Sequence, residues 1–179
     1  MTKWLLITCG YPFSGKTTLA RAVAEELGFT LVSVDDQHDL RGVGTDSRVI
    51  SERDWLQGYR SAYEQARAAF ERGESVIFDS VGHLRRNRDR LRRIAHRSGA
   101  KSLVVVLAVT ESEAMARLEQ NRANPIRPQV PSEGFAQIVR TFETPNGDEP
   151  QISFDPRDDL RVWISKRLRP MLGRREISA

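Results

Sequence analysis

Short apolar runs alternate along the chain with longer segments in which apolar residues recur at helical spacing. The apolar runs are rich in β-branched residues and end at polar residues, as strands buried in a parallel sheet do. In the longer segments apolar residues lie three or four positions apart, as Leu19, Val23 and Leu27 do, which predicts helices with one buried face. The alternation predicts an α/β fold with a parallel sheet, right-handed crossovers and helices on both faces. Strands are expected at residues 4–9, 29–34, 75–79, 102–109 and 151–154.

Capping residues set the expected helix boundaries. Ser51 and Thr110 each stand where a helix should begin, and Glu113 follows Thr110 at capping-box distance. Gly73 ends the helix that Ser51 begins. The polar segment 37–50 is expected to be a mobile loop. Helices are expected at about 18–27, 51–72, 83–97, 110–122, 132–142 and 160–168.

The segment after the first predicted strand matches the phosphate-binding loop G-x-x-x-x-G-K-[ST] without a mismatch. Strand, glycine loop and helix follow in the order that points backbone N–H groups and a helix N-terminus at phosphate oxygens. Gly15 lets the backbone approach the anion, Lys16 supplies a charge for the outer phosphates, and Thr17 is placed to bind Mg²⁺. The residues expected to bind ATP are Gly10, Tyr11, Pro12, Phe13, Ser14, Gly15, Lys16, Thr17 and Thr18, together with Arg122 further along the chain.

Two predicted strands end on aspartate. Asp35 and Asp36 follow the second strand, and Asp79 ends the third. Carboxylates at the C-terminal ends of parallel strands point into the ligand crevice. Beside a phosphate loop, Asp79 is therefore the second residue expected at a Mg²⁺ site. An Asx turn that closes the strand is the other interpretation of the pair Asp35 and Asp36.

Residues 117–142 have the pattern of a lid over a nucleotide. A helix that carries Arg117 and Arg122 breaks in a segment with three prolines, which contains Arg127, and a further short helix follows. The prolines restrict this segment and lower the entropy lost when a lid closes. Arg122 or Arg127 is expected to act on the transferred phosphate, and Arg117 to be structural. Ordinary surface charge is the other interpretation of these arginines.

Composition narrows the class of protein without identifying a substrate. The 179 residues suit one domain, residues 1–179, and no apolar run reaches the length of a transmembrane helix. The single cysteine, Cys9, leaves no intrachain disulfide and no thiolate zinc site. The first strand follows the N-terminus at once, so a cytoplasmic location without membrane attachment is expected. The net charge of +4 and the isoelectric point of about 9.6 fit a polyanionic substrate but do not require one.

The predicted helix 83–97 is strongly basic. It carries seven arginines opposite an apolar face. One interpretation is a solvated face. The other is that its first turn, near Asp79, contacts a phosphate of the substrate.

These motifs together resemble small P-loop kinases, in particular the polynucleotide-kinase-like and AAA_33-like ATP-binding family. The resemblance covers nearly the whole chain and rests on the phosphate loop, both strand ends, the lid and segments 130–133 and 142–145. It implies a three-layer αβα P-loop NTPase fold with strand order 2-3-1-4-5 and a small helical lid. It also implies that Asp35 is the general base. One departure stands out: His38 occupies the place where polynucleotide kinases commonly have an arginine that holds substrate phosphate.

The expected activity is transfer of the γ-phosphate of ATP, with Mg²⁺, to a hydroxyl group. The expected catalytic residues are Asp35, Lys16, Arg122 and Arg127. A 5′-hydroxyl of RNA or DNA is the first candidate acceptor, and a hydroxyl of a sugar, nucleotide or antibiotic is the alternative. A switch protein that hydrolyses ATP slowly without transfer is the rival class. The sequence has no Asn-Lys-x-Asp stretch, so guanine specificity is not expected.

Overall fold

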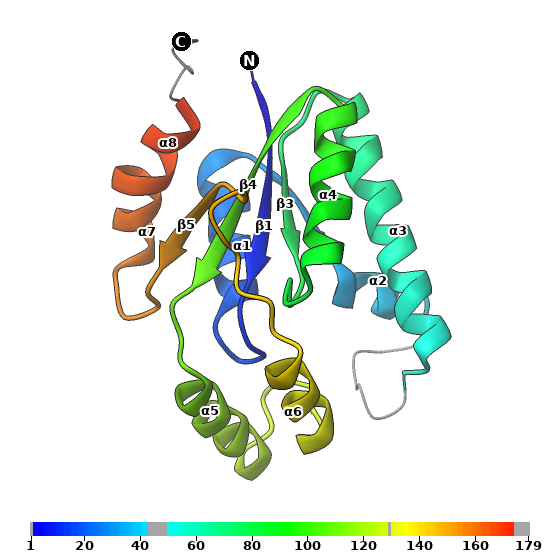
Figure 1. Cartoon of the computed structure of the whole chain (residues 1–179), viewed down its shortest axis with the longest axis vertical. Helices are drawn as coiled ribbons and strands as arrows, with labels where there is room; N and C mark the ends of the chain where they lie inside the picture. The colour runs from blue at the N-terminus through cyan, green and yellow to red at the C-terminus, as the bar shows by residue number, and fades with distance from the viewer. Residues whose placement is uncertain (1, 43–49, 129, 174–179) are drawn as a thin grey trace.

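A parallel sheet lies at the centre of the fold (Figure 1). The computed structural model describes residues 2–42, 50–128 and 130–173. Within these residues the strands are β1 (Lys3–Cys9), β2 (Thr30–Ser33), β3 (Val76–Asp79), β4 (Ala100–Leu107) and β5 (Gln151–Phe154). All neighbouring strands pair in parallel, in the order β2-β3-β1-β4-β5. The expected strand order and the expected fold class are confirmed.

Helices flank the sheet on both sides, and two of them stand beyond the carboxyl ends of the strands (Figure 1). The helices are α1 (Lys16–Leu27), α2 (Val34–Leu40), α3 (Glu52–Glu71), α4 (Arg85–Arg97), α5 (Glu111–Ala123), α6 (Ser132–Arg140), α7 (Leu160–Trp163) and α8 (Arg169–Gly173). A π-helical segment, η1 (Ile164–Leu168), continues α7 into α8. The pair beyond the strand ends is α5 and α6, at the bottom of the view.

The core has two layers because side chains of each strand alternate between the faces of the sheet. In β1, Leu5 and Ile7 pack with residues of α3 and α4, whereas Leu6 packs with α1 and with the C-terminal helices. All three side chains are fully buried. Burial of one such side chain stabilises the fold by about 1.5–3 kcal/mol. The layers hold β1 rigidly, and β1 leads directly into the phosphate loop.

The caps expected from the sequence are present. The Thr110 hydroxyl accepts a hydrogen bond from the Glu113 N–H, and the Glu113 carboxylate accepts one from the Thr110 N–H. The Ser51 hydroxyl accepts from the Asp54 N–H at the start of α3. Each cap satisfies an N–H group that has no partner within the helix.

The region after β2 differs from the expectation. The strand ends at Ser33 and α2 begins at Val34, so Asp35 and Asp36 lie in the first turn of a helix and residues 37–40 are helical rather than part of a loop. The Ser33 hydroxyl accepts from the Asp36 N–H (3.2 Å), which caps this helix. Carboxylates in a first turn also interact favourably with the helix dipole. Residues 43–49 of the expected loop lie outside the described residues.

The helix α2 packs against α3 through a glycine. The imidazole of His38 is fully buried, and a Cβ atom added at Gly58 would lie 2.5 Å from its Cε1 atom. The ring meets Trp55 edge-on, with 4.5 Å between ring centroids. Both ring nitrogens are buried without a hydrogen-bond partner among the described residues, and burial lowers the pKa of His38. The close fit of a neutral ring against Gly58 therefore fixes the helix that carries Asp35.

We expect Gly58→Ala to destabilise the protein by roughly 1–3 kcal/mol, because the added methyl group overpacks a filled site. The matched control is Gly134→Ala in α6, where an added Cβ would come no closer than 3.8 Å to its nearest neighbour. The control should gain up to about 1 kcal/mol from helix propensity. Urea unfolding of both variants measures the difference. Equal or greater stability of Gly58→Ala would show that α2 is not held in this way.

Candidate active site

The phosphate loop joins β1 to α1 in a strained backbone conformation. Gly15 has φ of 98°, and Phe13, with φ of 64°, is the one non-glycine residue with positive φ among those described. The N-terminus of α1 has no side-chain cap. A Cβ atom at Gly10 would lie 2.9 Å from Ser14 Oγ and 3.0 Å from Leu107 Cβ. The backbone thus takes a shape that glycine permits, and it leaves first-turn N–H groups uncapped, as an anion site requires.

Lys16 is buried within this loop. Its ammonium group donates a hydrogen bond to the Tyr11 carbonyl (2.6 Å). Burial lowers the pKa of Lys16 to about 8, although the charges of Asp79 and Asp35 act in the opposite direction. At neutral pH the side chain is thus a cation held inside the loop with two carboxylates nearby.

Asp79 lies at the end of β3, beside the loop, and is buried. Burial raises the pKa of Asp79, while a hydrogen bond from Thr17 and the charge of Lys16 lower it. Thr8 Oγ1 is 3.4 Å from Asp79 Oδ1. The structure thus brings together Thr17 and Asp79, the residues expected to hold Mg²⁺. A hydroxyl and a carboxylate oxygen are ligands of the kind Mg²⁺ prefers, so this pair fits the ion.

Asp35 faces the same cluster from the first turn of α2. Its side chain reaches solvent, but the surrounding protein removes part of its hydration. The pKa of Asp35 is raised to about 6, chiefly by this desolvation and then by the charge of Asp79, while the charge of Lys16 lowers it. Asp35 is therefore ionised at neutral pH and has a higher proton affinity than an ordinary aspartate.

Tyr59 is a residue of the site that sequence reasoning missed. It lies in the predicted helix 51–72, where its spacing from the neighbouring apolar residues predicts a place on the buried face. Burial raises the pKa of its phenol, as do Tyr63 and Asp35, and Ser80 is its hydrogen-bond partner. The tyrosine therefore lies at the edge of the site between α3 and the turn after β3. The spacing of apolar residues cannot distinguish Tyr59 from the core residues of α3, because Tyr59 and those residues recur with the same helical period.

The three arginines expected in the lid have different surroundings. Arg117 donates to the Phe13 carbonyl (3.2 Å) in the phosphate loop. Arg122 pairs with Glu119 (2.6 Å) and donates to Ser132 Oγ (2.6 Å), which joins α5 to α6. Arg127 is exposed and has no ion pair among those of the described residues. Arg127 is thus the arginine of the three whose side chain is not committed to a structural contact.

Asn121 holds the segment that carries Arg127, a role that no sequence motif indicates. Its buried amide accepts from the N–H groups of Ile126 (3.2 Å) and Arg127 (3.0 Å), and it donates to the Arg127 carbonyl (3.1 Å). The proline-bearing segment therefore has a defined backbone at residues 126 and 127.

A cavity of about 830 Å³ lies beside the phosphate loop. Its walls come from the loop, from α5 and from the segment after β5. They include Phe13, Thr18, Arg117, Arg127, Phe154 and Leu160. Aromatic and aliphatic groups with a few polar ones are the usual lining of a small-molecule site, and the volume falls in the range of such sites.

The first turn of α4 is occupied by the protein itself. The Glu143 carboxylate accepts from the Arg85 N–H (2.6 Å), and the Glu143 N–H donates to the His83 carbonyl (2.9 Å). The side chain of Arg85 pairs with Asp148, and Arg88 pairs with Glu149. Neither interpretation of the basic helix describes these contacts, because acidic residues from 143–149 neutralise much of its first half.

The described residues contain neither a ready-made metal cluster nor a membrane-spanning helix. No group of three or more His, Cys, Asp and Glu side chains placed to hold a metal occurs in residues 2–42, 50–128 and 130–173. In the same ranges no helix is long and apolar enough to cross a membrane. A magnesium ion at Thr17 and Asp79 would therefore need further oxygens from phosphate and water.

Comparison with models of protein families identifies the family to which this chain belongs. A family model described as an AAA domain matches residues 5–145. The chain belongs to the AAA_33 family. The uncharacterised protein Rv2004c of Mycobacterium tuberculosis is 36% identical to this AAA_33 chain over 86 residues. That match covers 43% of the chain, and the chain spans 17% of the length of the relative.

Solved structures share the fold of this AAA_33 protein. Kti12 from Chaetomium thermophilum, in complex with ADP-AlF3, has a TM-score of 0.75, 20% identity and coverage of 95% of this chain and 100% of that one. A sugar kinase from Janibacter sp. HTCC2649 has a TM-score of 0.71, 23% identity and coverage of 97% and 96%. The Pnkp1/Rnl/Hen1 RNA repair complex matches with a TM-score of 0.66, 21% identity and coverage of 78% and 44%. The predicted resemblance to P-loop kinases is confirmed, and at these identities the likeness shows the fold alone.

Proposed function

We propose that this AAA_33 protein is an ATP-dependent kinase that transfers the γ-phosphate to a hydroxyl group. One observation carries the proposal: Lys16, buried in the phosphate loop, and the carboxyl groups of Asp35 and Asp79 lie near one another where the parallel strands end. A nucleotide site needs the cation and one carboxylate. The second carboxylate, with its raised pKa, is what transfer to a hydroxyl additionally requires.

In this proposal the nucleotide base occupies the cavity beside α5, and the phosphates lie on the loop and the N-terminus of α1. Lys16 exchanges its bond to the Tyr11 carbonyl for a bond to an outer phosphate oxygen. A charge-assisted bond to phosphate is stronger than a bond to a neutral carbonyl, which favours the exchange. Mg²⁺, held by Thr17 and by Asp79 directly or through water, neutralises charge on the phosphates when it is bound.

Asp35 is the proposed general base. The acceptor oxygen forms a bond to the γ-phosphorus, its proton passes to Asp35, and the bond from phosphorus to the β–γ bridging oxygen breaks to release ADP. A base with a pKa near 6 is ionised at pH 7 and still takes up a proton readily. Because the base must be ionised, transfer should rise with pH up to about 6 and then level off.

The proposal treats residues 1–179 as one kinase domain with 117–142 as its lid. Arg127 is the better placed of the two candidate lid arginines, because Arg122 already joins α5 to α6. Closure of α5 and α6 would bring Arg127 to the transferred phosphate and exclude water. The Asn121 contacts support this role, since they fix the backbone from which Arg127 extends.

A small-molecule hydroxyl is the acceptor class that the contacts favour over a nucleic-acid end. The basic helix α4 was the main argument for a polyanion, and Arg85, Arg88 and Arg92 pair with acidic residues of the chain itself. One protein of similar fold is a sugar kinase, which supports a small-molecule acceptor. Another belongs to an RNA repair complex, so nucleic-acid ends are also tested as acceptors. Oligonucleotide binding that weakens steeply with salt would favour the nucleic-acid class.

The test of the proposal is transfer of label from γ-labelled ATP in the presence of Mg²⁺. The acceptor panel contains sugars, nucleosides, aminoglycosides and oligonucleotides with free 5′-hydroxyls. Label in one acceptor class supports the proposal and identifies the substrate class. Label found only as inorganic phosphate across the whole panel would favour the ATP-hydrolysing switch.

Lys16→Ala and Asp35→Asn should each lower transfer by about a hundredfold or more, since each removes a group that acts in the reaction. Only Lys16→Ala should greatly weaken ATP binding, because Asp35 does not contact the nucleotide in this proposal. Asp36→Asn is the matched control, with the same change one residue along the same turn. Transfer rates and ATP titrations measure both effects. Full activity of Asp35→Asn would rule out Asp35 as the base.

Arg127→Ala should lower the transfer rate by about a hundredfold or more, with a much smaller effect on ATP affinity, as for an arginine that acts on the transferred phosphate. Arg122→Ala should act less strongly, by loosening the contact between α5 and α6. Arg140→Ala, an exposed charge at the end of α6, is the control for lost charge. A rate for Arg127→Ala within a few-fold of the parent would show that Arg127 has no catalytic role.

A further inference from the structure

The turn that follows Asp79 sets the position of the phosphate loop. The Thr8 hydroxyl donates to the Ser80 carbonyl (2.8 Å), and the Ser80 N–H donates back to this hydroxyl (3.1 Å). The N–H of Gly10, the first residue of the loop, donates to the Val81 carbonyl (3.1 Å). The place of Gly10 relative to Asp79 therefore depends on this turn.

Gly82 is where the turn comes closest to β1. Its φ is +62°, and an added Cβ atom would lie 2.2 Å from the Thr8 carbonyl oxygen. The Gly82 carbonyl accepts from Arg88 (2.7 Å) and from Cys9 Sγ (3.3 Å). Contacts on both sides thus hold one peptide group of the turn.

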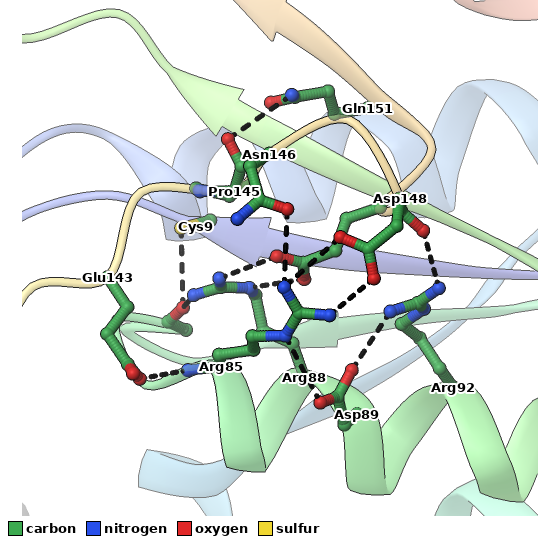
Figure 2. A network of polar contacts seen from close by, with 12 residues as sticks. Cys9, Arg85, Arg88, Asp89, Arg92, Glu143, Pro145, Asn146, Asp148 and Gln151 are labelled. Carbon is green, nitrogen blue, oxygen red and sulfur yellow. Dashed lines mark hydrogen bonds and ion pairs between the residues drawn. The ribbon is translucent and has the colours of Figure 1, made fainter.

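Arg88 connects this peptide group to a distant part of the chain (Figure 2). Its guanidinium donates to both carboxylate oxygens of Glu149, at 2.8 and 2.9 Å, in addition to the Gly82 carbonyl. Both side chains are fully buried. A buried ion pair gives little net stability compared with an apolar pair of similar size. The donors of the Arg88 guanidinium nevertheless fix the position of the Gly82 peptide group relative to Glu149.

Glu149 ends the segment by which the chain returns from α6 to the sheet. The start of that segment is fixed to the same turn, through the two hydrogen bonds that Glu143 forms with His83 and the N–H of Arg85. Figure 2 shows Arg85 and Arg92 reaching Asp148 from α4. The return segment 143–149, the turn 80–83 and the phosphate loop therefore form one continuous hydrogen-bonded unit.

We propose that Arg88 is a positioning residue of the active site. Through Gly82 it holds the turn that sets Gly10 against Asp79, and through Glu149 it fixes the end of the return segment 143–149 to the same turn. It does not contact the nucleotide or the reacting atoms. Only the kinetic part of its test rests on the proposed function.

The test is the double variant Arg88→Met/Glu149→Leu. It removes both charges together, so neither is left buried without a partner, and it removes the donor to the Gly82 carbonyl. The melting temperature should change little. Amide hydrogen exchange in peptides covering 8–18 and 76–84 should speed up by about tenfold, because one charge-assisted hydrogen bond is lost from the unit. Exchange in β4 should not change.

The kinetic part compares turnover with nucleotide affinity. Turnover at saturating ATP should fall by about tenfold, with a few-fold change at most in ATP affinity. Arg88→Lys should be intermediate, because one ammonium group cannot bridge all three acceptors. The matched control is Arg85→Met/Asp148→Asn, which removes an exposed pair between the same helix and the same segment. It should leave both turnover and exchange unchanged.

Unchanged exchange at 8–18 in a folded double variant would overturn the proposal, as would normal turnover. If the double variant does not fold, Arg88→Lys replaces it, because it keeps a buried charge beside Glu149 and loses the planar set of donors that joins Glu149 to Gly82. It should speed exchange at 8–18 by a smaller factor, and no change would again overturn the proposal. If the parent protein neither binds nor hydrolyses ATP, the proposed function fails, and the exchange measurement still decides the role of Arg88.

Discussion

The parallel pairing of β3 with β1 determines how the site is assembled. Ile7 of β1 pairs with Phe78 of β3, so the two strands end within one residue of each other. The phosphate loop leaves one strand where Asp79 ends the other, and β2 brings Asp35 to the same edge. Hydrogen bonds from Thr8 to the turn after Asp79 join the two strand ends. The strand order therefore gathers side chains from three separate stretches of sequence.

Opposite charges at this edge balance one another. Burial alone would favour neutral forms of Lys16, Asp35 and Asp79, and it moves all three pKa values in that direction. Mutual attraction opposes burial and keeps the lysine charged at neutral pH. A cation accompanying the phosphates would add positive charge beside the carboxyl groups of Asp35 and Asp79. The same arrangement that raises the proton affinity of Asp35 thus favours a metal-bound nucleotide.

Features set by neighbouring residues could be predicted from the sequence, and features set by packing could not. The phosphate loop, the end of β3 and the Thr110 cap depend on adjacent residues. The sequence predicts strand and loop where α2 lies, because β-branched Val34 extends an apolar run, although Ser33 is a possible cap. Tyr59 and Arg88 required the structure. Each resembles its helical neighbours in sequence, and Arg88 differs from the other arginines of α4 because it is fully buried together with its partner Glu149.

The most direct test of the central claim is the effect of Mg²⁺ on ATP binding, measured by calorimetry for the parent protein and for Asp79→Asn. If Thr17 and Asp79 hold the ion beside the phosphates, Mg²⁺ should strengthen ATP binding to the parent by about tenfold or more compared with a chelator-treated sample. Asp79→Asn should lose most of that gain and still bind ATP through the loop. Equal ATP affinity of the parent with and without Mg²⁺, or an undiminished gain in Asp79→Asn, would contradict the account.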